Sequence, residues 1–355
     1  MITLHQLLKA AVKQGASDLH IVAGSPPVLR VDSRIVRVKS PDLTADQSRQ
    51  VCYSILTDQQ KSRFEATKEL DFSFGIKGMA RFRANLFMQR GAVSGVFRRV
   101  PLEVPDIELL GLPRIVSEVV NFPTGLVLVT GPTGSGKSTT IAALIDKINK
   151  ESRGHIITLE DPIEYVHGHK SCIVNQREIG TDTVSYRSAL KHVLRQDPDV
   201  CMMGELRDFE TIDAALNICE TGHLVFATLH TNSAISSITR IVNVFPSDQQ
   251  ERVRTQLSLS LNTVMSQRLV PGGKGGMALA MEVLVMNPNI RNLIRENKLH
   301  QVYGMMQVGQ DKSGMMTMNQ SLLKLVLSRR IEVRAAFQYS ADPDELDKLL
   351  KAAGV

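Results

Sequence analysis

The stretch LVLVTGPTGSGKSTT, residues 126–140, constrains this chain more than any other segment. It opens with the apolar run Leu126–Val129, which suits a strand buried on both faces of a parallel sheet. Residues 131–138 then fit the pattern G-x-x-x-x-G-K-S, and the chain continues as a predicted helix to about residue 148. A glycine-rich turn between a buried strand and a helix is the setting in which this pattern binds phosphate.

Each residue type in this loop has a physical part in holding a phosphate group. Glycine allows a turn so tight that successive N–H groups point at phosphate oxygens. Lys137 is expected to reach the β- and γ-phosphates, and the Ser138 hydroxyl is expected to ligate Mg²⁺. The following helix adds the positive end of its dipole. The sequence therefore predicts ATP and Mg²⁺ as ligands, with the nucleotide held by Gly131, Pro132, Thr133, Gly134, Ser135, Gly136, Lys137, Ser138 and Thr139.

The composition is that of an ordinary globular protein with a small excess of positive charge. Hydrophobic residues make up 43% and charged residues 22%, and the formal net charge is +6. This excess is compatible with an anionic ligand or with the inner membrane surface, but it is too dispersed to argue for nucleic acid. The chain has no tryptophan and only 5% aromatic residues, which argues against a stacking platform for single strands. No nucleic acid partner is expected.

Other features of the sequence indicate the cellular compartment of the protein and the state of its cysteines. No uninterrupted apolar run reaches the roughly 18 residues that span a bilayer, and the opening MITLHQLLKA lacks the layout of a signal peptide. A cytoplasmic location is therefore expected. The four cysteines are scattered and include no C-x-x-C pair, so neither a zinc site nor a disulfide framework is predicted.

Changes of pattern along the chain predict its domains. Residues 1–100 form an α/β unit in this interpretation, residues 101–110 a linker, residues 111–270 the nucleotide-binding core and residues 271–355 a helical C-terminal region. The linker rests on the prolines of VPLEVPD. In the first unit, LHQLLKAAVKQG predicts an amphipathic helix that ends at glycine, and ARFRANLFMQRGAVSGVFRRV predicts a hairpin. One face of its first strand would carry Arg81, Arg83 and Asn85, and the other Phe82, Ala84 and Leu86.

Strands and helices alternate after the linker, which predicts a doubly wound parallel sheet that binds ligands at its carboxyl edge. Strands are expected at residues 126–130, 155–159, 200–203 and 224–229, with helices near 137–150, 185–196 and 208–221. After residue 245 the chain is expected to be mainly helical, with GGKGG at 272–276 as a flexible loop.

Carboxylates follow two of these predicted strands. Glu160, Asp161 and Glu164 come after the second strand, where the γ-phosphate and its metal would lie, although acidic residues of a helix N-terminus would produce the same pattern. Glu205 follows the third strand and is a candidate to hold Mg²⁺ or to position the attacking water. Next to it, Arg207 can be read simply as half of an ion pair with Asp208.

A histidine follows the fourth predicted strand. His230 could donate a hydrogen bond to the γ-phosphate or to a carboxylate, and so respond to which nucleotide is bound. An ordinary hydrogen-bonded histidine is the alternative.

Taken together, these motifs resemble a known family. The phosphate loop, TLEDPIEY, LRQDPDVCMMGELRD and TGHLVFATLHTNS are similar to the four nucleotide-site motifs of the secretion ATPase superfamily, which drives type II secretion, type IV pili and related machines. The resemblance covers nearly the whole chain. It implies a PAS-like N-terminal α/β domain followed by a RecA-like P-loop NTPase core and a helical C-terminal region.

The resemblance also implies roles that the residues alone do not. The chain would form a hexameric ring with the nucleotide between neighbouring subunits. Arg83 and Arg98 match family arginines that reach the phosphates from the N-terminal domain, with Arg81 a weaker match. Glu164 is expected to orient the attacking water and Glu205 to serve on the magnesium side, while the reverse assignment stays open. The implied partners are the inner-membrane platform protein and, through it, the pilus machinery, with only peripheral membrane association at the inner face of the membrane.

Within the superfamily, three features favour the retraction ATPases of type IV pili. The chain begins directly at the PAS-like domain, without the extra N-terminal module of extension ATPases. The segment after His230 has no cysteines, whereas extension and type II secretion relatives usually carry a four-cysteine zinc module there. NIRNLIRE, residues 289–296, is similar to the A-I-R-N-L-I-R-E signature of retraction ATPases, with asparagine in place of alanine. The expected function is an ATP-hydrolysing motor that powers pilin depolymerisation and twitching motility by movement of its two domains.

Three other functions compete with this expectation. A pilus-assembly or type II secretion ATPase is the nearest alternative, and a RecA-like DNA translocase is a more distant one. A nucleotide-sensing scaffold that does not hydrolyse ATP is the third, and the full set of carboxylates argues against it.

Overall fold

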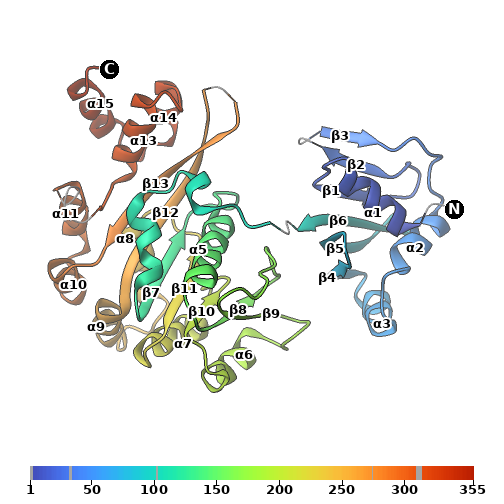
Figure 1. The fold of residues 1–355 in the computed structure, drawn as a ribbon, viewed down its shortest axis with the longest axis horizontal. Helices are drawn as coiled ribbons and strands as arrows, with labels where there is room; N and C mark the ends of the chain where they lie inside the picture. The colour runs from blue at the N-terminus through green and yellow to red at the C-terminus, as the bar shows by residue number, and fades with distance from the viewer. Residues whose placement is uncertain (1–2, 32–33, 101–102, 274, 309–313) are drawn as a thin grey trace. The chain divides into compact units, whose positions relative to one another are not determined.

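The computed structural model divides the chain into two compact units, each of which mixes helices and strands (Figure 1). One comprises Met1–Glu103 with Glu164–Val166, and the other comprises Val104–Ile163 with His167–Val355. The expected α/β fold class is confirmed. Among the described helices, none is long and apolar enough to span a membrane. The structure describes residues 3–31, 34–100, 103–273, 275–308 and 314–355.

The N-terminal unit is built on a six-stranded antiparallel sheet with the strand order β3-β2-β1-β6-β5-β4. Three helices supply apolar residues to its core, among them the predicted amphipathic helix α1. The elements are α1 Leu4–Lys13, β1 Asp18–Ile21, β2 Val28–Val31, β3 Arg34–Arg37, α2 Ala45–Tyr53, α3 Asp58–Thr67, β4 Glu69–Ile76, β5 Ala80–Gln89 and β6 Ala92–Val100.

The predicted hairpin of this unit is formed by β5 and β6. Phe82 and Leu86 are buried on one face of β5, while Arg81 and Arg83 are partly exposed on the other. Arg83 lies directly opposite Arg98 in the register of the two strands. The pleat therefore brings the two predicted phosphate-directed arginines to adjacent positions on one face.

The second unit is built on a seven-stranded sheet in the order β13-β12-β7-β11-β10-β8-β9. All neighbouring strands are parallel except β12 and β13, which are antiparallel. The strands are β7 Gly125–Thr130, β8 His155–Glu160, β9 Ile173–Glu178, β10 Val200–Met203, β11 Leu224–Leu229, β12 Leu261–Pro271 and β13 Met277–Val285. The four predicted core strands are thus present, within a residue at each end.

Helices cover both faces of this sheet (Figure 1). The P-loop helix α5 packs on one face with Ile141, Leu144 and Ile148, and α7, α8 and α9 supply the core on the other. The helices before the hairpin are α4 Arg114–Glu118, α5 Lys137–Glu151, α6 Tyr186–Val193, α7 Phe209–Glu220, α8 Ala234–Asn243 and α9 Gln250–Ser260, with short 3₁₀ turns η1 Ile107–Leu110, η2 Val119–Asn121 and η3 Leu194–Gln196. The predicted helices near 137, 185 and 208 are therefore confirmed. Of the predicted linker, residues 101–102 lie outside the described residues.

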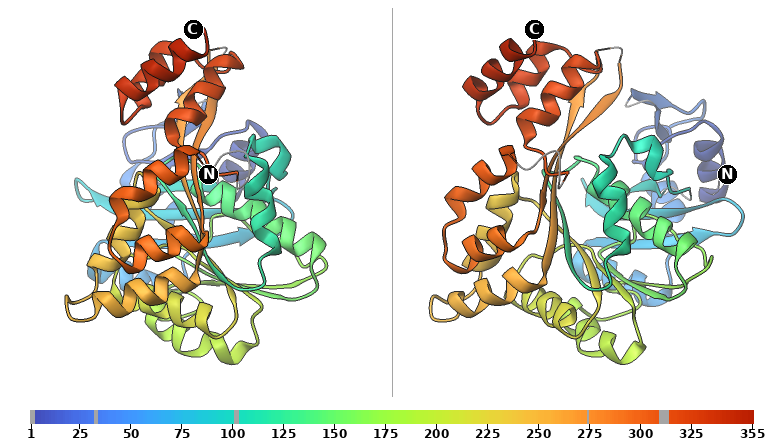
Figure 2. Two further views of the ribbon diagram at one scale, coloured as in Figure 1. Left: turned by 90° about the vertical axis from the view of Figure 1, so that its left-hand side faces the viewer. Right: turned by 60° about the vertical axis from the view of Figure 1, so that its left-hand side comes forward.

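After residue 245 most of the described elements are helices, as expected, but the prediction missed two strands. β12 and β13 form a long hairpin there, clearly visible in both views of Figure 2, and the predicted glycine loop joins its strands. Residue 274 of that loop lies outside the described residues. α9 passes directly into β12 with no glycine or proline between them, so the local sequence gives no sign of the change. Pairing of β12 with the distant strand β7 makes it a strand.

The remaining helices follow the hairpin along the chain. α13, α14 and α15 gather at its far end, where they share an apolar core with Val270, Ala278 and Ala280 (Figure 2). The C-terminal helices are α10 Pro288–Arg295, α11 Val302–Val308, α13 Met318–Leu327, α14 Val333–Tyr339 and α15 Pro343–Ala352, with η4 Leu299–Gln301.

A buried carboxylate joins this hairpin to two helices. Glu282 on β13 is only 5% exposed, and it accepts a 2.6 Å hydrogen bond from the backbone N–H of Ala234, the first residue of α8. It also accepts one from the N–H of Met318, the first residue of α13. Burial raises the pKa of Glu282, and the two N–H donors and the charge of Arg268 offset part of that effect. One side chain thus satisfies free donors at two helix N-termini.

Glu282→Gln should destabilise the protein by about 1–3 kcal/mol, because the amide places an N–H₂ group against one of the two backbone donors and leaves it buried without an acceptor. Urea unfolding followed by circular dichroism measures this loss. Glu296→Gln, at an exposed carboxylate bonded to Asn292 and Lys298, is the matched control and should not move the unfolding midpoint. Equal midpoints for wild type and Glu282→Gln would contradict the assigned role.

Candidate nucleotide-binding site

The predicted phosphate loop, residues 131–136, lies where β7 ends and α5 begins. β8, β10 and β11 run parallel to β7 and end at the same edge of the sheet. Their carboxyl ends carry the predicted residues Glu160, Glu205 and His230. The parallel topology therefore gathers these four segments at one edge.

The first glycine of the loop is required by a close backbone contact. Gly131 has φ 140°, and a Cβ at this position would lie 2.4 Å from the backbone oxygen of Gln267 on β12 and 2.7 Å from Ser135 Oγ. Gly134 and Gly136 also have positive φ, at 80° and 89°. These three conformations are ones that glycine adopts without strain, which explains the spacing of glycines in the motif.

Lys137 is the first residue of α5 and is buried. Its Nζ donates to the backbone oxygens of Gly131, at 2.8 Å, and Pro132, at 3.0 Å. Burial lowers the pKa of Lys137, and the negative charge of Glu205 opposes that shift. The ammonium group is thus held over the loop and within electrostatic reach of the carboxylate after β10.

The other loop residues differ in how open they are to a ligand. Pro132, Thr133 and Gly134 are exposed, and Ser138 and Thr139 are partly exposed on the first turn of α5. Ser135 is buried, and its hydroxyl has no hydrogen-bond partner within the described part of the chain. The tip of the loop and the hydroxyl-bearing residues Thr133, Ser138 and Thr139 are therefore accessible to a ligand.

The acidic residues after β8 separate into two kinds. Glu160 is 4% exposed and accepts hydrogen bonds from Thr158 Oγ1 at 2.6 Å and Gln176 Nε2 at 3.0 Å. Asp161 is exposed beside it. Of the two predicted nucleotide ligands, Asp161 is the one open to a bound molecule, while Glu160 is held by side chains of its own strand and of β9.

Glu205 lies between two basic side chains. Its Oε2 is 2.7 Å from Arg207 Nε, and its Oε1 is 3.5 Å from His230 Nε2. His230 thus lies within ion-pair distance of a carboxylate, one of the two partners considered for it from the sequence. Arg207 pairs with Glu205, whereas Asp208, the partner considered from the sequence, caps α7 through the N–H of Thr211.

Glu164 is paired with one of the predicted arginines. Its carboxylate accepts a 2.7 Å hydrogen bond from Arg83 Nη1, and the segment Glu164–Val166 belongs to the compact N-terminal unit. Arg98, on the neighbouring strand, instead donates at 2.8 Å to the buried carboxylate of Asp18. Burial opposes ionisation of Asp18, but its hydrogen bonds with Arg98 and Ser17 and the charge of Arg98 lower its pKa.

Two residues at this edge of the sheet were not predicted from the sequence. Gln267 holds the loop from β12, through its backbone contact with Gly131 and a 2.7 Å bond from its side chain to Thr140 Oγ1. Glu282 lies in the same cross-strand row as Ser266 and Thr130, whose hydroxyls are 2.7 Å apart. A single acidic residue inside the apolar run MALAMEVLV was the available signal for Glu282.

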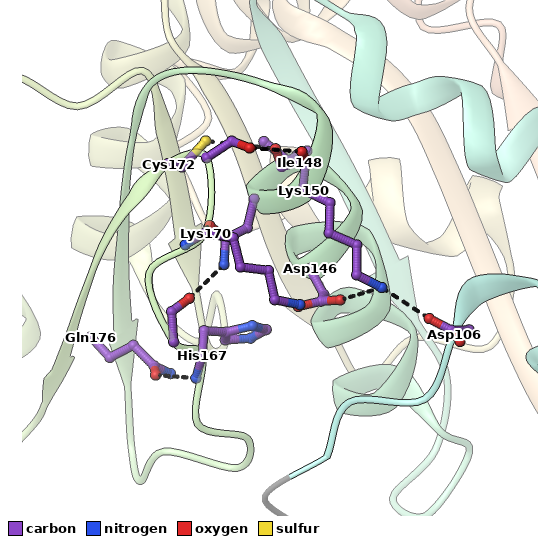
Figure 3. Close-up of polar contacts among 11 residues, drawn as sticks. Asp106, Asp146, Ile148, Lys150, His167, Lys170, Cys172 and Gln176 are labelled. Atoms are coloured by element: carbon purple, nitrogen blue, oxygen red, sulfur yellow. Dashed lines mark hydrogen bonds and ion pairs between the residues drawn. The ribbon is translucent and has the colours of Figure 1, made fainter.

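A network of charges anchors the segment that follows the acidic box (Figure 3). The buried Asp146 of α5 pairs with Lys170 from residues 167–172 and, at 3.0 Å, with Lys150 one turn along the helix. Lys150 also pairs with Asp106 at 2.9 Å. Asn149, fully buried, donates to the Gly168 oxygen at 2.7 Å. The P-loop helix is thus tied both to this segment and to the chain that enters the second unit.

Asp146→Asn should lower the free energy of unfolding by about 1–2 kcal/mol at pH 7, less than for a fully buried pair because the two lysine side chains are 40% and 47% exposed. Urea titrations across pH measure the loss. Burial opposes ionisation of Asp146, yet the two lysines outweigh it and lower its pKa.

The pH dependence of this difference follows from the direction of the shift. Stabilisation by a carboxylate with a lowered folded pKa is complete above its unfolded value, near 4, and is lost as the pH falls through the folded value. Wild type and Asp146→Asn should therefore converge below about pH 4. Asp347→Asn, which removes an exposed i,i+4 pair with Lys351, is the control and should cost less than about 0.5 kcal/mol. A pH-independent gap would contradict the charge network.

Comparison with known proteins places the chain in a family. The family described as "Type II/IV secretion system protein" matches residues 1–334. The "Type IV pilus retractation ATPase PilT" of Pseudomonas aeruginosa is 47% identical over 339 residues, 96% of this chain and 98% of that protein. A "Twitching motility protein" of Neisseria gonorrhoeae is 45% identical over 93% of this chain and 88% of that protein.

A solved structure gives the same result in three dimensions. The "Crystal Structure of the Pilus Retraction Motor PilT and Bound ADP" superimposes with a TM-score of 0.93 at 50% identity, covering 98% of this chain and all of that one. The expected kinship with secretion ATPases is therefore confirmed, as is the expected ATPase activity. The chain belongs to the type II/IV secretion system protein family and is an ATPase of that family.

Proposed function

We propose that this chain is the ATP-driven motor of type IV pilus retraction and that it works as a ring of six copies. The observation that carries the proposal is the match to retraction ATPases along both units, at 47% identity over nearly the full length of each protein. The second-ranked function, pilus assembly or type II secretion, has weaker support. A type II secretion relative is 34% identical over 75% of this chain and 53% of its own length.

In this proposal the second unit binds ATP through the phosphate loop. Backbone N–H groups of the loop after Pro132 cradle the β- and γ-phosphates, and Lys137 exchanges its two backbone oxygens for phosphate oxygens. The Ser138 hydroxyl and the Glu205 carboxylate are hard oxygen donors, which suit Mg²⁺. When bound, the ion would neutralise charge on the phosphate oxygens.

The carboxylates then divide the remaining tasks. Glu164 orients the attacking water and accepts its proton. Glu205 helps to hold the magnesium ion, and His230 lies beside it. The 2.7 Å pair with Arg83 holds the Glu164 carboxylate in one place. Arg83 and Arg98 stabilise the charge that develops on the transferred phosphoryl group. The reverse assignment of the two glutamates is the alternative.

The energy of hydrolysis moves one unit against the other, and the ring passes this movement to a central partner. That partner is the inner-membrane platform protein at the base of the pilus, so the ring associates peripherally with the cytoplasmic face of the membrane. The output is removal of pilin subunits from the base of the fibre. These assignments rest on the resemblance to retraction motors and on the arginines that the N-terminal unit carries.

Lys137→Ala should abolish ATP hydrolysis, by at least about 10²-fold, because the γ-phosphate loses its main cationic contact. Phosphate release from purified protein measures this. Lys147→Ala, at an exposed i,i+4 pair on the same helix, is the control and should keep wild-type turnover. In a strain without the native gene, the wild-type chain should restore pilus retraction and Lys137→Ala should not. Normal retraction without the gene, in a strain free of paralogues, would contradict the proposed task.

Arg83→Ala should lower the turnover number roughly 10²-fold while ATP affinity changes less than about threefold, because the arginine acts mainly on the transition state. Steady-state kinetics combined with binding of a fluorescent nucleotide separates the two quantities. Arg63→Ala, on the exposed surface of α3, is the matched arginine control. An unchanged turnover number would remove Arg83 from the mechanism.

A further inference from the structure

A cavity of about 310 Å³ opens beside the nucleotide-binding edge. Its walls come from the ends of β10 and β11 and from α8, and none of the roles assigned above uses Arg240, Thr231 or the space itself. Leu229, in its wall, accepts a 3.2 Å hydrogen bond from the N–H of Gly131, so the cavity borders the phosphate loop. The lining residues are Glu205, Leu206, Arg207, Leu229, His230, Thr231 and Arg240.

The charges around this cavity do not balance. The two oxygens of Glu205 are taken up by Arg207 and His230, so one guanidinium is already neutralised. Arg240 pairs with no carboxylate in the part of the chain that the structure describes, and its hydrogen bond is a long one, 3.5 Å, to the backbone oxygen of Arg207. An uncompensated guanidinium facing a cavity favours an anion there.

Phosphate is the anion that this position favours. Glu205 and Leu229 both line the cavity, and the backbone of Leu229 is bonded to the first glycine of the phosphate loop, so the cavity lies next to the loop proposed to hold the terminal phosphate. Hydrolysis at that loop would release inorganic phosphate beside the cavity. Arginine matches phosphate geometry with two parallel N–H donors, and the Arg207 guanidinium lies beside the same space as a second donor.

We propose that this cavity is a binding site for the inorganic phosphate cleaved from ATP, with Arg240 as its principal ligand. Phosphate in the cavity competes with Glu205 for Arg207 and with the carbonyl oxygen for Arg240. Its departure then returns Glu205 to the pair seen here. The inference rests on the proposed ATP hydrolysis for the source of the phosphate, but phosphate binding itself can be measured without turnover.

The first test measures binding alone. Inorganic phosphate is titrated into wild-type protein saturated with ADP, at constant ionic strength, and the unfolding temperature is followed. The proposal requires an increase for wild type that is lost in Arg240→Gln and partly retained in Arg240→Lys. Arg252→Gln, at an exposed arginine 3.9 Å from Asp213, is the matched control and should respond as wild type does. An equal increase for wild type and Arg240→Gln would overturn the assignment.

The second test uses turnover and separates the two sources of a phosphate group. Arg240→Gln should weaken product inhibition by inorganic phosphate at least about tenfold, with KM for ATP changed less than about twofold. A raised KM with unchanged phosphate inhibition would overturn the proposal, because the arginine would then hold the γ-phosphate of bound ATP. If wild type hydrolyses no ATP but still binds phosphate through Arg240, the proposed function fails while this site stands.

Discussion

The close contact between the phosphate loop and β12 is the constraint on which the rest of the site depends. β7 is buried along its whole length between β11 and β12, and it ends at a glycine whose α-carbon leaves no room for a side chain against the Gln267 backbone oxygen. The loop therefore starts from a fixed point. Because parallel strands end together, that point also fixes where Glu205 and His230 stand relative to Lys137.

The functional side chains at this edge are restrained by partners before any nucleotide enters. Lys137 is bonded to loop carbonyl oxygens, and Glu205 lies between Arg207 and His230. Restraint of this kind reduces the reorganisation needed when charge develops on a phosphoryl group. It also means that a bound phosphate must exchange with existing partners. In the proposals above, binding and release of phosphate are therefore coupled to changes in side-chain pairing.

Outside the site, buried polar groups connect elements that are far apart in the chain. Glu282 joins β13 to the first residues of α8 and α13, and Asp146 joins α5 to the segment around Lys170. Each of these carboxylates would be costly to bury without its partners, so the elements they join are specified relative to one another.

The sequence alone determined the phosphate loop, the parallel core strands and the residues at their carboxyl ends. Those strands are short apolar runs buried on both faces and bounded by turns, so local pattern and final structure agree. The long hairpin β12–β13 was decided only by the tertiary structure, because α9 runs into β12 without a turn residue and pairing with β7 determines the strand. The tertiary structure also decided which groups pair with Glu164, Glu205 and Glu282. Arg83, His230 and the N–H of Ala234 come from other segments than the glutamates they contact, so no local spacing predicts these pairs.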